Sequence, residues 1–150
     1  MKVRTPCVWV GGKTRLANWI LPLIDVECKT YVEPFGGSAA LLLNRDPVDV
    51  EVYNDIDSAL VTFMLCIKHH YHELVREISE LPISRDLYRK DLRWLKDGYP
   101  GVMTDIQFAA RCWYLNLNSF GGITGGGFGT GKHQNRTFRN RSKILDAAMA

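Results

Sequence analysis

The feature that most constrains the fold is a glycine turn that follows a short β-branched run. Residues 30–33, Thr-Tyr-Val-Glu, have the composition of a buried strand, and Pro34-Phe-Gly-Gly-Ser38 follows directly. Residues 48–53 alternate valine with acidic residues, which predicts a second strand that ends at Asn54-Asp55. We expect residues 38–44 to form a helix between the strands, with Ser38 as its cap. This βαβ order predicts an α/β fold of the doubly wound kind.

The glycine turn and Asp55 together predict a nucleotide-type cofactor site. In a doubly wound sheet, the turn after the first strand lies at the crevice where nucleotides bind, and glycines let the backbone approach a ligand. Asp55 lies 18 residues after Gly37, close to the offset of roughly 20 at which an acidic side chain binds ribose hydroxyls. The fingerprint GxGxxG is missing, which disfavours NAD and FAD. A phosphate-binding loop ending in Gly12-Lys13-Thr14 would need glycine where Cys7 stands.

Helical patterns surround this unit. Apolar spacing predicts helices over five segments, residues 13–24, 57–67, 73–81, 84–96 and 104–117. Residues 121–131 contain seven of the thirteen glycines, so we expect a mobile loop or a hairpin there. Only two strands are convincing, which predicts exposed sheet edges.

Composition is that of a globular domain, with 46% hydrophobic and 23% charged residues. The chain has neither a secretory signal nor an apolar run long enough for a membrane span, so we expect a cytoplasmic protein. The four cysteines form no CxxC pair, and the cluster His69-His70-Tyr71-His72 suits a surface helix better than a metal site. The net charge is +3. Residues 132–150 hold five Lys and Arg against one acidic residue. This basic cluster is either a phosphate contact or a solvated end of the chain.

Four sequence blocks resemble, in order, those of the Dam-type adenine-specific (N6) DNA methyltransferases. They are Trp9-Val-Gly-Gly-Lys13, Val32-Glu-Pro-Phe-Gly-Gly-Ser38, Asn54-Asp-Ile-Asp57 and Tyr114-Leu-Asn-Leu-Asn-Ser-Phe-Gly-Gly122. The resemblance implies part of a Rossmann-like fold that binds S-adenosylmethionine, with a helical insertion and a glycine-rich hairpin that contacts DNA. It also implies three regions: the N-terminal part of the cofactor-binding domain at 1–57, a DNA-recognition region at 58–140, and a return to the catalytic domain at 141–150.

The resemblance further implies roles for single residues. Trp9 and Lys13 would line the methionine end of the cofactor, Asp55 would bind the ribose, and Ile56 would pack on the adenine. The pocket floor would consist of Glu33, Pro34, Phe35 and Gly37. Double-stranded DNA would be contacted by Asn118, Phe120, Lys132, Arg136 and Arg139, with Ile123 and Phe128 as further candidates. Leu117 and Gly121 stand where the family usually has Arg and Asn, so the target sequence stays open.

The catalytic D-P-P-Y segment of that family is absent. The prolines stand at 6, 22, 34, 47, 82 and 100, and no two are adjacent. In the family this segment accepts hydrogen bonds from the adenine amine and stacks on the flipped base. We therefore expect no adenine methylation by this chain alone. The favoured explanation is a fragment of a methyltransferase. The alternatives are one half of a split enzyme, completed by a second chain, and a non-catalytic S-adenosylmethionine- or DNA-binding protein with a regulatory or interference role.

Overall fold

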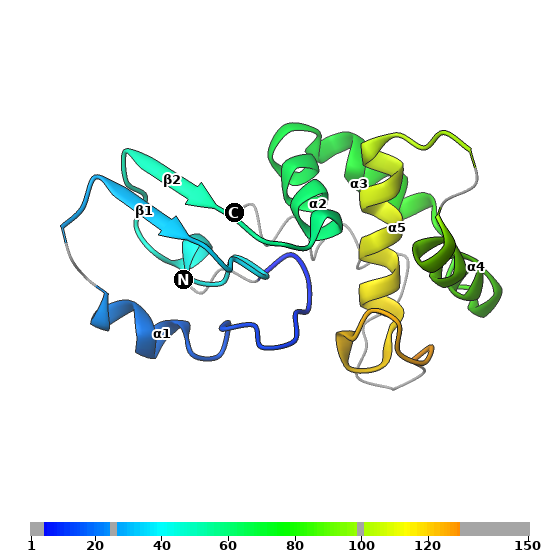
Figure 1. Cartoon of the computed structure of the whole chain (residues 1–150), viewed down its shortest axis with the longest axis horizontal. Helices are drawn as coiled ribbons and strands as arrows, with labels where there is room; N and C mark the ends of the chain where they lie inside the picture. Colours follow the sequence, from blue (N-terminus) through cyan, green and yellow to red (C-terminus); the bar gives the residue numbers. More distant parts are fainter. Residues whose placement is uncertain (1–4, 25–26, 99–100, 130–150) are drawn as a thin grey trace.

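The computed structural model describes residues 5–24, 27–98 and 101–129, which form a small sheet and a group of helices. Figure 1 shows β1, β2 and α1 at one end of the molecule and α2–α5 at the other. This mixture of helices and a parallel sheet agrees with the predicted α/β class. Within the described residues the sheet has two strands, so a doubly wound sheet stays a prediction. In that part of the chain, no helix combines the length and apolarity that crossing a membrane requires.

The two predicted strands are confirmed. β1 (Thr30–Glu33) and β2 (Val50–Tyr53) pair in parallel, with Thr30 opposite Val50 and Glu33 opposite Tyr53. β2 begins two residues later than the valine alternation predicts. Because the strands are parallel, their carboxyl ends lie at the same edge of the sheet, and the glycine turn and Asp55 leave from that edge.

The predicted helix over residues 38–44 is wrong. This segment forms turns followed by a short 3₁₀ helix, η2 (Leu42–Asn44), and Ala39 has a left-handed φ of 55°. A continuous helix would direct the N–H of Leu42 to the carbonyl of Ser38. Here the N–H of Leu42 donates to the Glu33 carboxylate at 2.7 Å instead. A hydrogen bond to a side chain nine residues earlier therefore overrides a segment of good helix formers.

The predicted helix over residues 13–24 is shorter than expected. The structure has α1 (Ala17–Ile20) followed by a 3₁₀ turn, η1 (Leu21–Leu23). Pro22 lies in that turn and has no N–H to donate, which ends a regular helix.

Four longer helices form the second part of the molecule, and three begin at polar caps. They are α2 (Ser58–His69), α3 (Tyr71–Glu80), α4 (Arg85–Asp97) and α5 (Asp105–Asn118). Asp57, Ser84 and Thr104 each accept a backbone N–H of the first turn of α2, α4 and α5. Such caps stabilise a helix by about 1 kcal/mol each. The predicted helices over 57–67, 73–81, 84–96 and 104–117 are therefore confirmed to within a few residues.

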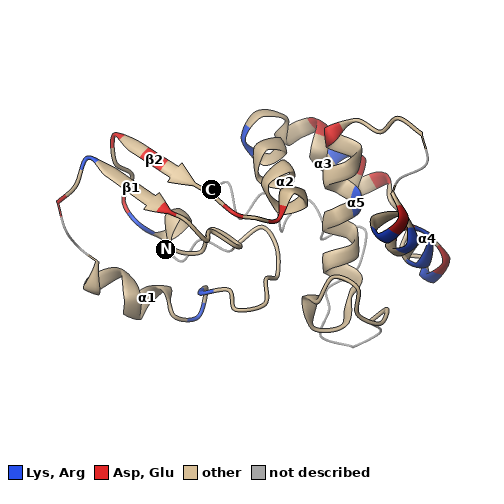
Figure 2. Ribbon diagram, viewed as in Figure 1, with Lys and Arg blue, Asp and Glu red and all other residues tan. Residues whose placement is uncertain are grey.

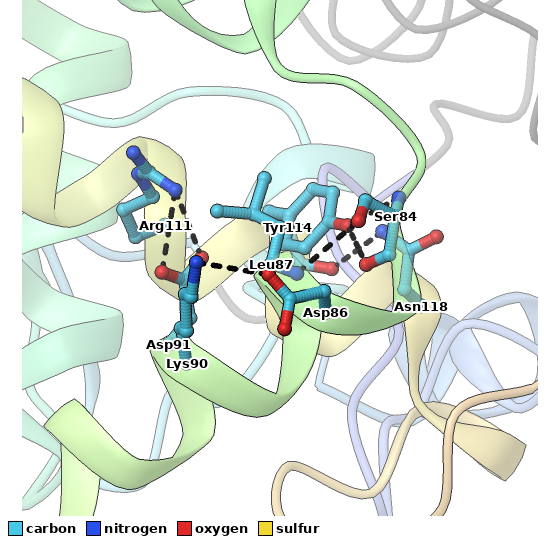
Figure 3. A network of polar contacts seen from close by, with 8 residues as sticks. All are labelled: Ser84, Asp86, Leu87, Lys90, Asp91, Arg111, Tyr114 and Asn118. Atoms are coloured by element: carbon cyan, nitrogen blue, oxygen red, sulfur yellow. Dashed lines mark hydrogen bonds and ion pairs between the residues drawn. The ribbon is translucent and has the colours of Figure 1, made fainter.

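The apolar core lies between these helices rather than under the sheet. Leu74, Ile78 and Tyr114 have no exposed surface, whereas half of Val32 on β1 is exposed. Polar contacts also tie α4 to α5 (Figure 3), where Arg111 Nη1 donates to both carboxylate oxygens of Asp91 at 3.2 Å. The helical part thus has a core of its own, whereas Glu33 is the only buried residue of β1 and β2.

Candidate functional site

A cavity of about 590 Å³ opens at the carboxyl edge of the sheet. Its walls come from three separate segments, residues 9–13, residues 31–41 and Asp55, together with Ile20 and Ile24. Of the predicted cofactor residues, the following line it: Trp9, Lys13, Glu33, Pro34, Phe35, Gly37 and Asp55. The fold thus gathers residues that lie up to 46 positions apart in the sequence around one space.

Ile56 is the predicted cofactor residue that does not line this cavity. Its side chain is 98% exposed, and Phe35 at the cavity wall is 83% exposed. Both are apolar groups without cover in the described structure. Packing of Ile56 on an adenine ring stays a prediction.

The glycine turn continues the pairing of the two strands. Asn54 N–H donates to the Glu33 carbonyl at 2.9 Å, and Gly36 N–H donates to the Asn54 carbonyl at 2.8 Å. Gly36 lies against Tyr53, because a Cβ built on Gly36 would stand 2.1 Å from the ring. The Tyr53 hydroxyl then donates to the Gly37 carbonyl at 2.7 Å. The turn is therefore held in one conformation by the strand that follows it in the sheet.

Asp55 braces the same turn. One carboxylate oxygen accepts the N–H of Gly37 at 2.9 Å, and the other accepts the N–H of Asp57 at 3.0 Å. The 18-residue offset, which predicts that Asp55 binds a ribose, thus also separates two residues that are in direct contact, Gly37 and Asp55. A carboxylate has about four acceptor positions, so Asp55 can still accept two hydroxyl groups after making both bonds.

Trp9 joins the N-terminal block to the turn. Gly37 has a φ of +52°, and a Cβ there would lie 2.9 Å from Trp9 Cδ1, so the indole packs directly on the glycine. Gly12 donates its N–H to the Trp9 carbonyl at 2.9 Å and forms a tight turn that leads to Lys13. These two glycines let the tryptophan, the ammonium group and the turn share one cavity wall.

Glu33 is the buried acid of the site, with 8% of its surface exposed. Its Oε1 accepts the N–H of Leu42 at 2.7 Å and the hydroxyl of Tyr31 at 3.0 Å. Burial raises the pKa of Glu33, although both hydrogen bonds and the positive charges of Lys13 and Arg45 act in the opposite direction. Burial and the neighbouring Glu33 also raise the pKa of Tyr31 to about 12. The Glu33 carboxyl therefore fixes the loop after the turn and brings a titratable group to the cavity wall.

The N-terminal block is also fixed from its other side, by α5. Trp113 Nε1 donates to the Pro6 carbonyl at 2.9 Å. The Asn116 side chain accepts the Val8 N–H at 3.2 Å and donates to the Val8 carbonyl at 2.7 Å and the Gly122 carbonyl at 3.1 Å. Sequence reasoning missed both positioning residues. The available signal was Asn116 inside the block that begins at Tyr114.

Asn116 connects the cavity to the glycine-rich segment after α5. Within residues 119–129 this segment is a loop closed by one antiparallel bridge, between Ser119 and Phe128, with a 3₁₀ turn η3 (Phe120–Gly122). The Tyr88 hydroxyl of α4 bonds the Ser119 hydroxyl at 2.8 Å and donates to the Gly126 carbonyl at 2.6 Å. A hairpin with two regular strands stays a prediction.

The predicted DNA contacts fall into three groups. Phe120 is 74% exposed, and Ile123 is 53% exposed on the same loop. Asn118 is fully buried, with its amide nitrogen donating to the Tyr114 carbonyl at 2.8 Å, so this conformation offers it no surface for DNA. Lys132, Arg136 and Arg139 lie outside the described residues. DNA contact by all six residues stays a prediction.

Comparisons with known proteins agree with the four sequence blocks. The family model of D12 class N6 adenine-specific DNA methyltransferases matches residues 9–147. The Type II methyltransferase M.MjaIII of Methanocaldococcus jannaschii is 30% identical over 142 residues, which cover 82% of this chain and 48% of that protein. The Type II methyltransferase M.CviBI of Paramecium bursaria Chlorella virus NC1A is 24% identical over 117 residues, which cover 77% and 43% of the two chains. The chain thus spans about half the length of these relatives.

Proposed function

Because the chain belongs to the D12 class of N6 adenine-specific DNA methyltransferases, we propose that its cavity binds S-adenosylmethionine for site-specific methylation of adenine in double-stranded DNA. The observation that carries this proposal is the meeting of Trp9, Lys13, the glycine turn and Asp55 around one cavity. The finer architecture belongs to the same proposal. Residues 1–57 would be the N-terminal part of a Rossmann-like cofactor domain, residues 58–140 a DNA-recognition region, and residues 141–150 the return to the catalytic domain.

The residues present fit the chemistry of this cofactor. S-adenosylmethionine carries a carboxylate at one end, vicinal ribose hydroxyls in the middle and an adenine ring at the other end. Lys13 offers a cation for the carboxylate, Asp55 offers acceptors for the hydroxyls, and Trp9 and Phe35 offer apolar rings. When bound, the cofactor supplies an electrophilic methyl group on its sulfonium centre. The role of the chain's own residues is to bind and orient this molecule.

The amine-activating groups are the part that these 150 residues do not supply. An adenine amine is a poor nucleophile because its lone pair is delocalised into the ring, so the site needs acceptors for its N–H groups. No D-P-P-Y segment occurs in the sequence. We propose that this segment comes from further sequence or from a second chain, and that the chain by itself binds the cofactor without methylating DNA. A fragment and a split-enzyme half both satisfy this arrangement.

The second candidate function is that of a non-catalytic protein that binds S-adenosylmethionine or DNA. The missing D-P-P-Y segment favours it, since cofactor binding requires none of those residues. A regulatory or interfering role would follow from occupancy of the cofactor or of the DNA site alone. The two functions differ in whether a D-P-P-Y polypeptide restores methylation.

Calorimetry of S-adenosylmethionine with the purified chain tests the cofactor assignment. We expect binding that Asp55→Asn weakens by about tenfold or more, since hydrogen bonds to a charged acceptor contribute about 1.5–3 kcal/mol. Asp49→Asn is the matched control, because Asp49 is an exposed acid that does not line the cavity. Absence of binding by the wild-type chain, or equal affinity of wild type and Asp55→Asn, would refute the assignment.

Mass spectrometry of digested duplex DNA tests the activity. We expect no N6-methyladenine after incubation with the chain and S-adenosylmethionine. Addition of a separate polypeptide that carries a D-P-P-Y segment of this family should produce it if the chain is one half of an enzyme. Continued inactivity with intact cofactor binding would favour the non-catalytic candidate, and methylation by the chain alone would contradict both.

A further inference from the structure

One row of α4 carries only positive charge. Arg85, Arg89, Arg93 and Lys96 are spaced by four, four and three residues, which places them on one face of a helix. All four are exposed, and Figure 2 shows the concentration of Lys and Arg on this helix. We call these four residues the α4 basic row.

Two of the three acidic residues of the same helix are engaged elsewhere, and the third, Asp97, is exposed at the last position of the helix. Asp86 forms an ion pair with Lys90 at 2.9 Å, and this contact lowers the pKa of Asp86. Asp91 is fully buried and faces Arg111 of α5. The α4 basic row has no ion-pair partner among the residues that the structure describes. Its charge is therefore available to an external anion.

Another exposed helix of the same chain shows what an ordinary solvated face looks like. α3 mixes Glu73, Arg76 and Glu80 on its exposed surface, and Arg76 pairs with Glu80 at 3.4 Å. Mixed signs at this spacing are typical of a solvated helix. A row of one sign carries mutual repulsion that a solvated face does not need, which favours a binding role for the α4 row.

The row is continuous with the glycine-rich loop. The Arg85 guanidinium lies over the Phe128 ring, 5.7 Å from its centroid, and the Tyr88 hydroxyl bonds both Ser119 and Gly126 of the loop. The loop also exposes Phe120, an apolar side chain of the kind that inserts between base steps. Cations and an exposed aromatic group therefore lie on one connected structural unit, a combination suited to duplex nucleic acid rather than to a protein acid patch.

We propose that the α4 basic row contacts the phosphate backbone of the double-stranded DNA that this chain binds, a proposal that rests on the function proposed above. From Arg85 to Lys96 the helix rises about 16 Å, which corresponds to about five base-pair steps of 3.4 Å. The row thus spans several phosphates of one strand. Contacts to phosphate carry no sequence information, so the row sets the position and affinity of the chain on DNA and leaves the choice of site to the loop.

The salt dependence of duplex binding tests this proposal with the full chain. Each phosphate contact contributes about 0.9 to the slope of log K against log salt concentration. The variant Arg89→Gln/Arg93→Gln should lower that slope by about 1.8. It should also weaken binding, and the loss of affinity should be equal for duplexes of unrelated sequence. Both positions are exposed, and far-ultraviolet circular dichroism with the thermal midpoint verifies that the variant is folded.

The matched control is Lys68→Gln/Arg76→Gln, which removes the same charge from exposed positions of α2 and α3. We expect its slope to stay within about 0.3 of wild type, well below the effect of two lost phosphate contacts. An unchanged slope in the α4 variant, an equal fall in the control, or tighter binding of single-stranded RNA than of duplex DNA would each overturn the proposal. Absence of duplex binding by the wild-type chain would refute the DNA-binding function as well, and the α4 assignment with it.

Discussion

The side chain of Asn116 hydrogen-bonds both backbone groups of Val8, which lies 108 residues earlier in the sequence. The distances are 3.2 Å to the Val8 nitrogen and 2.7 Å to its carbonyl oxygen. The same amide nitrogen also donates to Gly122 at 3.1 Å. One side chain of α5 therefore holds the segment that leads into the cavity and the loop proposed to approach DNA.

The first prediction concerns this contact. Asn116→Ala should lower the free energy of unfolding by about 2 kcal/mol or more, because it removes three hydrogen bonds at a site that is 7% exposed. It should also weaken S-adenosylmethionine binding, since Trp9 follows Val8 directly. Urea denaturation and calorimetry measure the two effects. Asn18→Ala, at an exposed position of α1, is the control, and a variant that loses stability with unchanged cofactor affinity would contradict the positioning role.

The second prediction concerns the turn itself. Gly36→Ala would place a Cβ 2.1 Å from the Tyr53 ring, so the ring must move and its hydrogen bond to Gly37 must lengthen or break. We expect a loss of about 1–3 kcal/mol of stability, typical of overpacking, together with weaker cofactor binding. Gly127→Ala is the control, because a Cβ there meets nothing within 4 Å. Equal thermal midpoints for the two variants would show that the turn tolerates the extra carbon.

The parts of this fold that sequence predicted are those fixed by neighbours in the chain. β1, β2 and the helices over residues 57–67 and 84–96 follow from β-branched composition, alternation and apolar spacing within each segment. The absent helix over residues 38–44 shows the limit of that reasoning. Local propensity favours a helix there, but the carboxylate of Glu33 takes the Leu42 N–H that the helix would have used.

For the candidate site, the glycine turn, its offset to Asp55 and the family resemblance predicted residues that the fold gathers around one cavity, and the roles of these residues stay predictions. The 18-residue offset identified Gly37 and Asp55, and the structure joins them at 2.9 Å. The offset did not predict that the Asp55 carboxylate also holds the glycine turn by accepting backbone N–H groups. The links from Trp113 and Asn116 to Pro6 and Val8 cross more than 100 residues, and no local pattern encodes such a contact.

The third prediction concerns the buried ion pair between α4 and α5 (Figure 3). Arg111→Met should lower stability at pH 7 by about 3 kcal/mol, because Asp91 is fully buried and loses its cation. Burial already raises the pKa of Asp91, and Arg111 opposes that rise. Without Arg111 the folded-state pKa rises further, so the folded state of the variant binds a proton more tightly than the unfolded chain does.

The loss of unfolding free energy caused by Arg111→Met should therefore become smaller as the pH falls from 7 towards 5. Urea denaturation of the variant and the wild type at several pH values measures this loss. Arg76→Met on α3 is the control, since its partner Glu80 is exposed and needs no neutralisation. A deficit that stays constant over this pH range would show that Asp91 does not titrate there.

The fourth prediction concerns Cys7, which packs in the helical core with 8% of its surface exposed. Burial raises the pKa of this thiol from 9.0 to about 12, with a smaller effect from the charge of Asp57. Above pH 9 the unfolded chain loses this proton and the folded chain retains it, so stability is complete below pH 9 and falls as the pH rises towards 12.

Between pH 7.5 and 9.5 this one thiol should cost the wild-type chain about 0.8 kcal/mol of unfolding free energy. Cys7→Ala removes the thiol. Between pH 7.5 and 9.5 the unfolding free energy of this variant should therefore fall by about 0.8 kcal/mol less than that of the wild type, whatever the stability of the variant at pH 7.5. Urea denaturation of both chains at the two pH values measures the difference. Cys28→Ala is the matched control for the loss of a cysteine, since Cys28 is exposed. Parallel pH profiles for wild type and Cys7→Ala would mean that the thiol ionises as readily in the folded chain as in the unfolded one. The N-terminal segment would then not be packed on α5 in the way that the Trp113 and Asn116 contacts require.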